Sequence, residues 1–183
     1  MFCFFINANS YSQKAGEYSL NLYAGGGISF FAGEAGTPRD INTTLSKTKP
    51  IGTLRVMWQP DHLLGLGLES GIVNFYSYDI HDTIKGNTDV SAVPVIIAFS
   101  MPLVKHLKAF FGPGGYFITS KVDYKLKTHS NTFSLGWMAA LSYSKPISKT
   151  CDIVTEFKWL NARETRDGSL SLQILLKWKL LSW

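Results

Sequence analysis

The sequence predicts an all-β protein, an eight-stranded antiparallel up-and-down transmembrane β-barrel. Three observations carry this prediction. Eight segments alternate apolar residues with polar or small ones, which is the period of a strand. The connections between them alternate in length, long then short. The charged fraction is 17%, below the roughly 25% of soluble domains. No run approaches the ~20 apolar residues of a membrane-spanning helix, so strands must do the spanning.

The last segment, Ser169 to Trp183, shows the alternation most clearly. One face would carry Leu170, Leu172, Ile174, Leu176, Trp178 and Leu180. The other would carry Ser169, Ser171, Gln173, Lys177 and Lys179, with Leu175 as an apolar exception. A helix is excluded because Lys177 and Lys179 would interrupt any apolar stripe.

The remaining segments and their connections follow the same scheme along the chain. We expect strands at residues 17–31, 51–59, 63–78, 91–101, 109–120, 133–144, 152–160 and 169–183. We expect long polar loops at 33–49, 79–89, 121–131 and 161–168, and short turns at 59–62, 102–106 and 145–149. The stretch FFGPGGYF has apolar residues in both rows, so the pattern does not decide which row faces the lipid and which faces the lumen.

The composition of the row opposite the apolar one distinguishes a transmembrane barrel from a soluble barrel of lipocalin type. A soluble barrel would expose that row to water and charge it densely, but here it is largely Gly, Ser, Ala and Asn, which suits a crowded lumen. Aromatic residues also stand where two interface girdles would lie. These are Trp58, Phe99 and Tyr143 before short turns, Phe30, Phe133 and Trp159 beside long loops, and Trp178 in the last strand.

With these features, the chain resembles the small eight-stranded outer-membrane barrels common in Bacteroidota, including the PorT-like and OmpA-barrel-like groups. The resemblance is carried by LNLYAGGGISF, LGLGLESGI, VPVIIAF, FFGPGGYF and the terminal strand. It implies a bacterial outer-membrane location, and Trp183 resembles the C-terminal aromatic signal for barrel insertion. The leading hypothesis for function is a non-enzymatic structural or accessory subunit of an envelope complex, such as secretion or assembly machinery. A narrow channel for small or apolar solutes, as in OmpW-like barrels, is the alternative, and a lipid A-modifying enzyme is a third.

The first residues, 1–13, predict the remnant of a secretory signal peptide, because a short apolar run precedes small and polar residues. The barrel domain would then occupy residues 14–183. Cys151 would be the sole cysteine left, so no internal disulfide is expected.

Charged residues in the lumen row are expected to pair. Counting back from the turn at His62 sets Arg55 opposite Glu69, and counting across the last loop sets Glu156 near Lys177, with Lys158 nearby. An unpaired buried charge is costly, and an eight-stranded barrel is just wide enough for side chains to fill. A plugged lumen is therefore favoured over a gated ion or solute path.

Catalytic and ligand-binding patterns are weak. His129 and Ser130 are adjacent, so in a strand they would face opposite sides and could not act as base and nucleophile. His81 with Asp79 and Asp82 lies in a polar loop. No metal-binding spacing or phosphate-cradling glycine loop is present, so we expect neither a cofactor nor an enzyme.

The expected partners follow from location and charge. Outer-membrane lipid and lipopolysaccharide, and another outer-membrane protein in a complex, are the candidates. The basic loop residues Arg39, Lys47, Lys49, Lys121, Lys125 and Lys127 would lie near lipopolysaccharide phosphates, although loop solubility is the favoured explanation. Nucleic acid is not expected, because the lysines behind the net charge of +5 are scattered.

Overall fold

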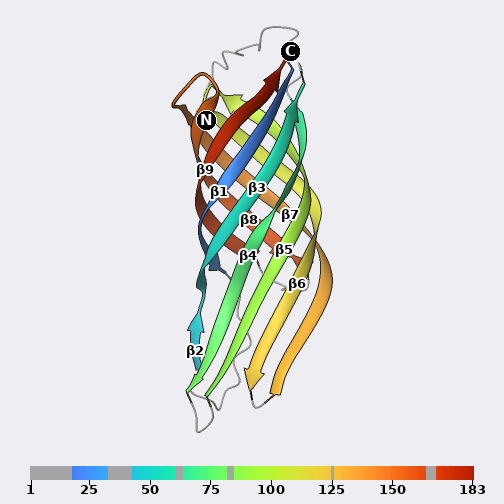
Figure 1. The fold of residues 1–183 in the computed structure, drawn as a ribbon, viewed down its shortest axis with the longest axis vertical. Coiled ribbons are helices and arrows are strands. Elements are labelled where there is room, and N and C mark those ends of the chain that lie inside the picture. Colours follow the sequence, from blue (N-terminus) through green and yellow to red (C-terminus); the bar gives the residue numbers. More distant parts are fainter. Residues whose placement is uncertain (1–17, 33–42, 61–63, 82–84, 125, 164–167) are drawn as a thin grey trace, which may run out of the picture.

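A computed structural model describes residues 18–32, 43–60, 64–81, 85–124, 126–163 and 168–183. The strands are β1 Ser19–Phe31, β2 Thr43–Ser46, β3 Thr48–Gln59, β4 Gly65–His81, β5 Lys85–Val104, β6 Leu107–Tyr124, β7 Leu126–Pro146, β8 Cys151–Ala162 and β9 Gly168–Ser182. All pairings are antiparallel, in the order β2-β4-β3-β1-β9-β8-β7-β6-β5, and β5 returns to β4 (Figure 1). Eight strands thus close a barrel, and the predicted fold class is confirmed. The four-residue β2 extends β4 beyond the end of β3.

The barrel closes where its first and last strands meet. β1 pairs with β9 from Ser19 to Phe31, with one register shift after Leu20. Beyond that shift, Tyr18 N–H donates to the Trp183 carbonyl at 2.9 Å, and Trp183 N–H donates back to Tyr18 at 3.1 Å. Both chain ends of the described barrel therefore lie at the end that carries the short turns (Figure 1).

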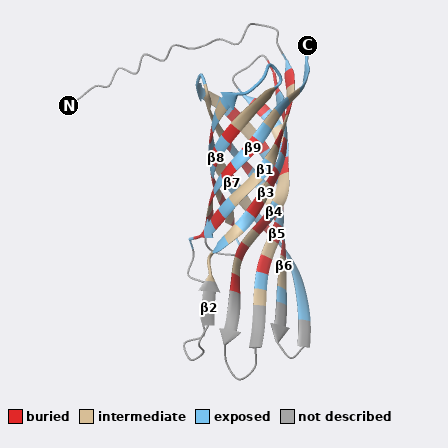
Figure 2. Ribbon diagram, turned by 60° about the vertical axis from the view of Figure 1, so that its left-hand side comes forward, coloured by how far each residue is buried: buried red, intermediate tan, exposed pale blue. Residues whose placement is uncertain are grey.

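Side chains alternate between an exposed outer row and a buried lumen row (Figure 2). In β9, Leu172 and Ile174 are 53% and 60% exposed, whereas Gln173 and Leu175 are 1% and 0% exposed. The apolar row of the closing strand therefore points outward, as predicted. An apolar outer wall around a polar-centred lumen is the arrangement of a membrane-spanning barrel.

The wall is taller on one side. β4, β5, β6 and β7 have 17, 20, 18 and 21 residues, whereas β1, β3, β8 and β9 have 13, 12, 12 and 15. The four long strands and β2 run past the others at the end opposite the termini (Figure 1). Because short turns face the periplasm in such barrels and long connections face outward, we call this the outer end and the other the turn end.

Three predicted loops are wrong in extent. The loop at 33–49 contains β2 and the start of β3, the loop at 79–89 is mostly β4 and β5, and the loop at 121–131 is mostly β6 and β7. These strand ends extend past the apolar segments of the sequence and are polar in composition, so the alternation that reveals a strand is absent from them.

Pro94 lies inside β5. It faces the lumen and stands opposite Tyr116 of β6. Having no N–H, it leaves a gap in the β4–β5 ladder, where pairing stops at Ser70–Val95 and resumes at Val73–Ala92.

In the part of the chain that is described, no helix is long and apolar enough to cross a membrane. The predicted signal segment, residues 1–13, lies outside the described residues.

Candidate functional site

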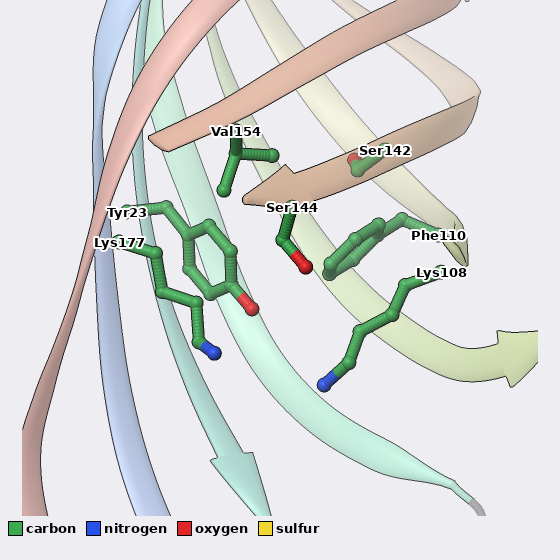
Figure 3. A pocket seen from close by; sticks show the side chains of 7 residues that line it. All are labelled: Tyr23, Lys108, Phe110, Ser142, Ser144, Val154 and Lys177. Atoms are coloured by element: carbon green, nitrogen blue, oxygen red, sulfur yellow. The ribbon is translucent and has the colours of Figure 1, made fainter. Parts of the chain in front are cut away.

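The lumen is filled in three layers, beginning with a polar mouth at the turn end. Lys177 Nζ forms an ion pair with Asp152 Oδ2 at 2.7 Å. Lys108, from β6, donates to the Gln59 amide oxygen at 3.5 Å and forms no ion pair with the residues that the structure describes. A pocket opens between these side chains, lined by Tyr23, Lys108, Phe110, Ser142, Ser144, Val154 and Lys177 (Figure 3).

The predicted proximity of Glu156 and Lys177 is wrong. The β8–β9 register sets Glu156 opposite Gln173 and Lys177 opposite Asp152, so Lys177 lies nearer the turn end. Lys177 therefore belongs to the mouth, while Glu156 belongs to the layer above it.

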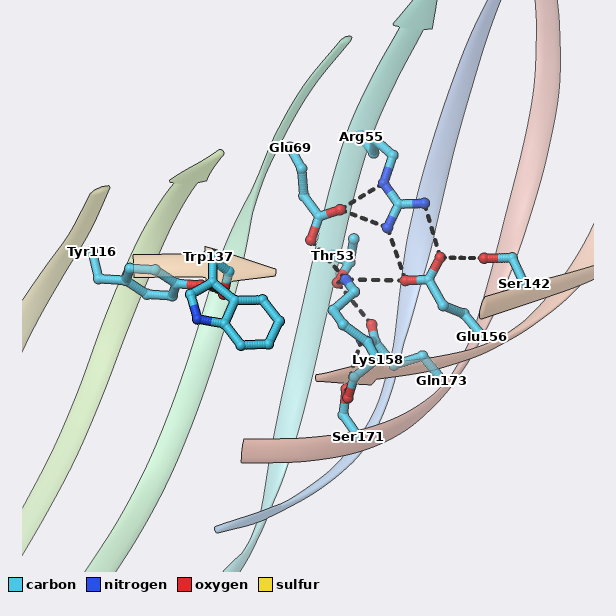
Figure 4. A network of polar contacts seen from close by, with 10 residues as sticks. All are labelled: Thr53, Arg55, Glu69, Tyr116, Trp137, Ser142, Glu156, Lys158, Ser171 and Gln173. Carbon is cyan, nitrogen blue, oxygen red and sulfur yellow. Dashed lines mark hydrogen bonds and ion pairs between the residues drawn. The ribbon is translucent and has the colours of Figure 1, made fainter. Parts of the chain in front are cut away.

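The middle layer is organised by Arg55 (Figure 4). Its Nε donates to Glu69 Oε2 at 2.5 Å, and Nη1 and Nη2 donate to the two oxygens of Glu156 at 2.8 Å each. Glu69 is the register partner on β4, as the sequence predicts, whereas Glu156 reaches across the lumen from β8. A guanidinium suits this position because its fork binds carboxylates in bidentate fashion.

Lys158 completes a ring of alternating charge. Its Nζ lies 2.7 Å from Glu69 Oε1 and 3.1 Å from Glu156 Oε1, so each carboxylate contacts both cations. We call Arg55, Glu69, Glu156 and Lys158 the charge quartet. All four side chains are at most 2% exposed. The two positive and two negative charges balance, which is what a buried cluster requires to offset its desolvation.

Neutral side chains satisfy the remaining polar atoms of the quartet. Ser142 Oγ donates to Glu156 Oε2 at 2.6 Å, and Lys158 Nζ donates to Thr53 Oγ1 at 2.9 Å. Thr53 in turn donates to Gln173 Oε1 at 2.7 Å. These bonds connect β3, β4, β7, β8 and β9, so the network cross-links opposite walls of the barrel.

Aromatic rings separate the quartet from the mouth. The Arg55 guanidinium carbon lies 4.1 Å from the Phe110 ring centroid and 5.6 Å from that of Tyr23. The two rings meet edge to face at 5.8 Å. Both contacts are in the range of cation–π attraction, and the rings cover the guanidinium on the turn-end side.

The layer toward the outer end is apolar. Its large fully buried members are Phe31, Phe75, Ile96, Tyr116, Met138 and Leu160. Phe31 and Phe75 pack edge to face with centroids 6.1 Å apart. This layer was not predicted from the sequence; the apolar residues that fall in the lumen row, such as Phe31, are the signal that indicates it. With this layer, the described lumen is packed on both sides of the quartet, toward the outer end and toward the turn end.

The predicted girdle residues face outward or lie partly exposed. Trp58, Tyr143 and Trp178 are 42%, 53% and 36% exposed in the turn-end half, and Phe30 and Phe133 are 51% and 54% exposed in the outer half. Phe99 and Trp159 are partly exposed. Trp183 is 62% exposed and stacks on Tyr18 at 6.1 Å. Their placement suits interface anchoring and insertion, which stay predictions.

The residues considered for catalysis are not brought together. His129 and Ser130 are successive exposed residues of β7. Asp79, His81 and Asp82 are not described at the level of side chains. Within the described ranges, no group of three His, Cys, Asp or Glu residues could hold a metal ion.

One edge of the tall wall is open. β7 pairs with β6 along its whole length, but its pairing with β8 begins only at Gly136. Residues 126–135 therefore have no strand on their other side among the residues described, and 128–133 are all exposed. We call residues 126–135 the β7 edge.

Comparisons with known proteins agree on the fold. No protein-family model matches the chain, and no curated protein sequence matches it. Among solved structures, Ail, the attachment invasion locus protein of Yersinia pestis, is similar with a TM-score of 0.51 and 14% identity, over 90% of this chain and 97% of that one. The outer-membrane protein OprG of Pseudomonas aeruginosa has a TM-score of 0.51 and 11% identity, over 92% and 98%. The chain thus has the fold of small outer-membrane β-barrels.

Proposed function

We propose that the protein is a non-conducting, non-enzymatic outer-membrane barrel that holds a β-sheet above the membrane for a partner protein, as an accessory subunit of an envelope complex. The observation that carries the proposal is the open β7 edge. An exposed edge strand presents unpaired N–H and C=O groups, and an extended segment of another chain can add to it as a further strand.

The composition of the edge supports this role. Natural edges are usually protected by proline, bulges or shortness, but the β6–β7 register runs without a shift from Leu107–Tyr143 to Tyr124–Leu126. The exposed stretch Thr128–Phe133 is mainly polar, so it stays soluble without a partner. Specificity would come from other side chains on its outer row, such as Asn131.

The filled lumen supports a role for the outer surface rather than for transport. The quartet leaves no unpaired charge in its layer, and the large side chains of the apolar layer are hydrocarbon apart from the Tyr116 hydroxyl, which already donates to the Trp137 carbonyl. The narrow-channel alternative would need one of these layers to open. Membership of the PorT-like group, which the sequence resemblance suggests, would provide an envelope complex as the setting.

The backbone direction on the β7 edge allows a selective test. Ser144 N–H donates to the His106 carbonyl of the neighbouring turn at 2.8 Å, so even-numbered residues of β7 point their N–H toward β6. Odd-numbered residues, including His129, point theirs away. Proline at 129 therefore removes a free-edge N–H and spares the β6–β7 ladder.

The experiment is a pull-down of tagged full-length protein from detergent-extracted native envelopes, with partners quantified by mass spectrometry. We expect a stoichiometric envelope protein with the wild type and with His129→Ala, and at least a tenfold loss with His129→Pro. Equal recovery by the proline variant, or equal loss by the alanine variant, would contradict strand addition. The purified barrel should also show no discrete conductance in planar bilayers, since steady conductance would favour the channel.

A further inference from the structure

We propose that the mouth at the turn end is a binding pocket for a small soluble oxyanion of the phosphate type, held by Lys108, Lys177 and Tyr23. These three side chains come from β6, β9 and β1 and converge on one pocket, where both ammonium groups and the phenol hydroxyl point into the same opening (Figure 3). This site lies at the other end of the barrel from the β7 edge and does not depend on it.

Lys108 is a cation without a counter-charge. It is only partly exposed, forms no ion pair in the described part of the chain, and reaches just one weak neutral acceptor, Gln59 Oε1 at 3.5 Å. The nearest candidate, Asp152, is engaged by Lys177 at 2.7 Å. Two lysines and one aspartate therefore leave the mouth with excess positive charge. A partly desolvated ammonium in this position gains from an anion.

Tyr23 supplies an independent observation. The residue is 3% exposed, yet its hydroxyl has no hydrogen-bond partner among the described residues. Its ring is held by Phe110 at 5.8 Å, which fixes the hydroxyl in the pocket. A phenol hydroxyl that lines the pocket and donates to no described residue can donate to a ligand there.

The hydroxyls of the two serines in the lining are already committed as donors. Ser142 donates to Glu156 at 2.6 Å, and Ser144 donates to the His106 carbonyl at 3.3 Å. The available donors are thus the two ammonium groups and the phenol. Several converging donors suit an oxyanion with several acceptor oxygens, and the ligand must be soluble because the pocket opens into the lumen rather than onto the lipid-facing wall.

The test is isothermal titration calorimetry of the detergent-solubilised full-length barrel with inorganic phosphate, in chloride buffer of constant ionic strength. We expect saturable one-to-one binding that chloride does not abolish. Lys108→Met should weaken it about tenfold or more, because a charged hydrogen bond is lost, and Tyr23→Phe should weaken it several-fold. The matched control is Lys145→Met, which removes the same charge from an exposed residue near the end of β7 and should leave affinity unchanged.

Far-UV circular dichroism would establish that each variant is folded, and Tyr23→Phe keeps the ring contacts should Lys108→Met fail to fold. Absence of saturable heat with the wild type would overturn the proposal. So would equal weakening by Lys145→Met, which would mean general electrostatic attraction, or full displacement by equimolar chloride. His129→Pro should not change phosphate binding, so the proposal for this pocket and the proposal for the β7 edge are tested independently.

Discussion

Removing Arg55 should destabilise the barrel more than any other single substitution in the quartet. Arg55→Met keeps most of the side-chain volume but deletes three charged hydrogen bonds and leaves two carboxylates facing one lysine. Each charged hydrogen bond is worth about 1.5–3 kcal/mol, but such values do not add within a network. Breaking a buried ion pair by removing one partner costs roughly 3–5 kcal/mol, which is our expected loss of unfolding free energy.

Removing a carboxylate together with Arg55 should recover part of this loss. In Arg55→Met with Glu69→Gln, the remaining Lys158 and Glu156 still form a neutral pair at 3.1 Å. The double variant should therefore be more stable than Arg55→Met alone, with a coupling energy of about 2 kcal/mol or more.

The assay is equilibrium unfolding in urea of the barrel folded in lipid or detergent, followed by tryptophan fluorescence. The control cycle uses the solvent-accessible pair Lys49 and Asp89, whose side chains are 24% and 52% exposed and whose charged atoms are 3.8 Å apart, with Lys49→Gln and Asp89→Asn. Its coupling should be at most about 1 kcal/mol. Simple additivity at Arg55 and Glu69, or coupling no larger than in the control, would refute the argument that the quartet is a mutually dependent unit.

Three further outcomes test the wall and the lumen in the same unfolding assay. Gly136→Ala should lower the free energy of unfolding by about 1–3 kcal/mol, because the added methyl group would overlap the Asn161 carbonyl and lie 2.7 Å from the Tyr116 ring. Gly52→Ala is the control, since its nearest contact is 3.9 Å away and its stability should be nearly unchanged. Ile174→Arg at mid-wall should cost about 2–4 kcal/mol in a bilayer, and Leu181→Arg near the end about 0–1; equal costs would argue against this membrane position. Ser142→Ala should cost about 1–3 kcal/mol by removing a donor to buried Glu156, and no loss would mean that water replaces the hydroxyl.

The strands inside the lipid band could be predicted from sequence because one face meets lipid and the other meets the lumen. Ile174 and Gln173 differ in exposure, 60% against 1%, for that reason. The contrast ends with the band. From Thr119 onward, β6 carries polar residues in both rows, Thr119, Ser120 and Lys121, so its last part resembles a loop in composition although the ladder to β7 continues to Tyr124.

The charge quartet could be predicted only where it follows the register of adjacent strands. Arg55 and Glu69 are separated by one short turn, so counting sets them opposite each other. Glu156 meets Arg55 across the lumen, 101 residues away in sequence, through the closure and tilt of the barrel. Neighbouring registers do not contain that information, which is why Glu156 was expected beside Lys177 instead.

The three layers of the lumen divide the molecule into two ends that communicate with different compartments. The apolar layer excludes water on the outer side of the quartet, and the Tyr23 and Phe110 rings cover it on the turn-end side. A charge network in such surroundings is strong when intact and costly when broken, so the quartet holds the walls together rather than opening readily. A ligand at the turn-end mouth would then contact the floor of a rigid plug, and a partner on the β7 edge would dock on a rigid sheet. Binding at either end is therefore expected to leave affinity at the other unchanged, and titrating phosphate into the partner complex would measure that independence.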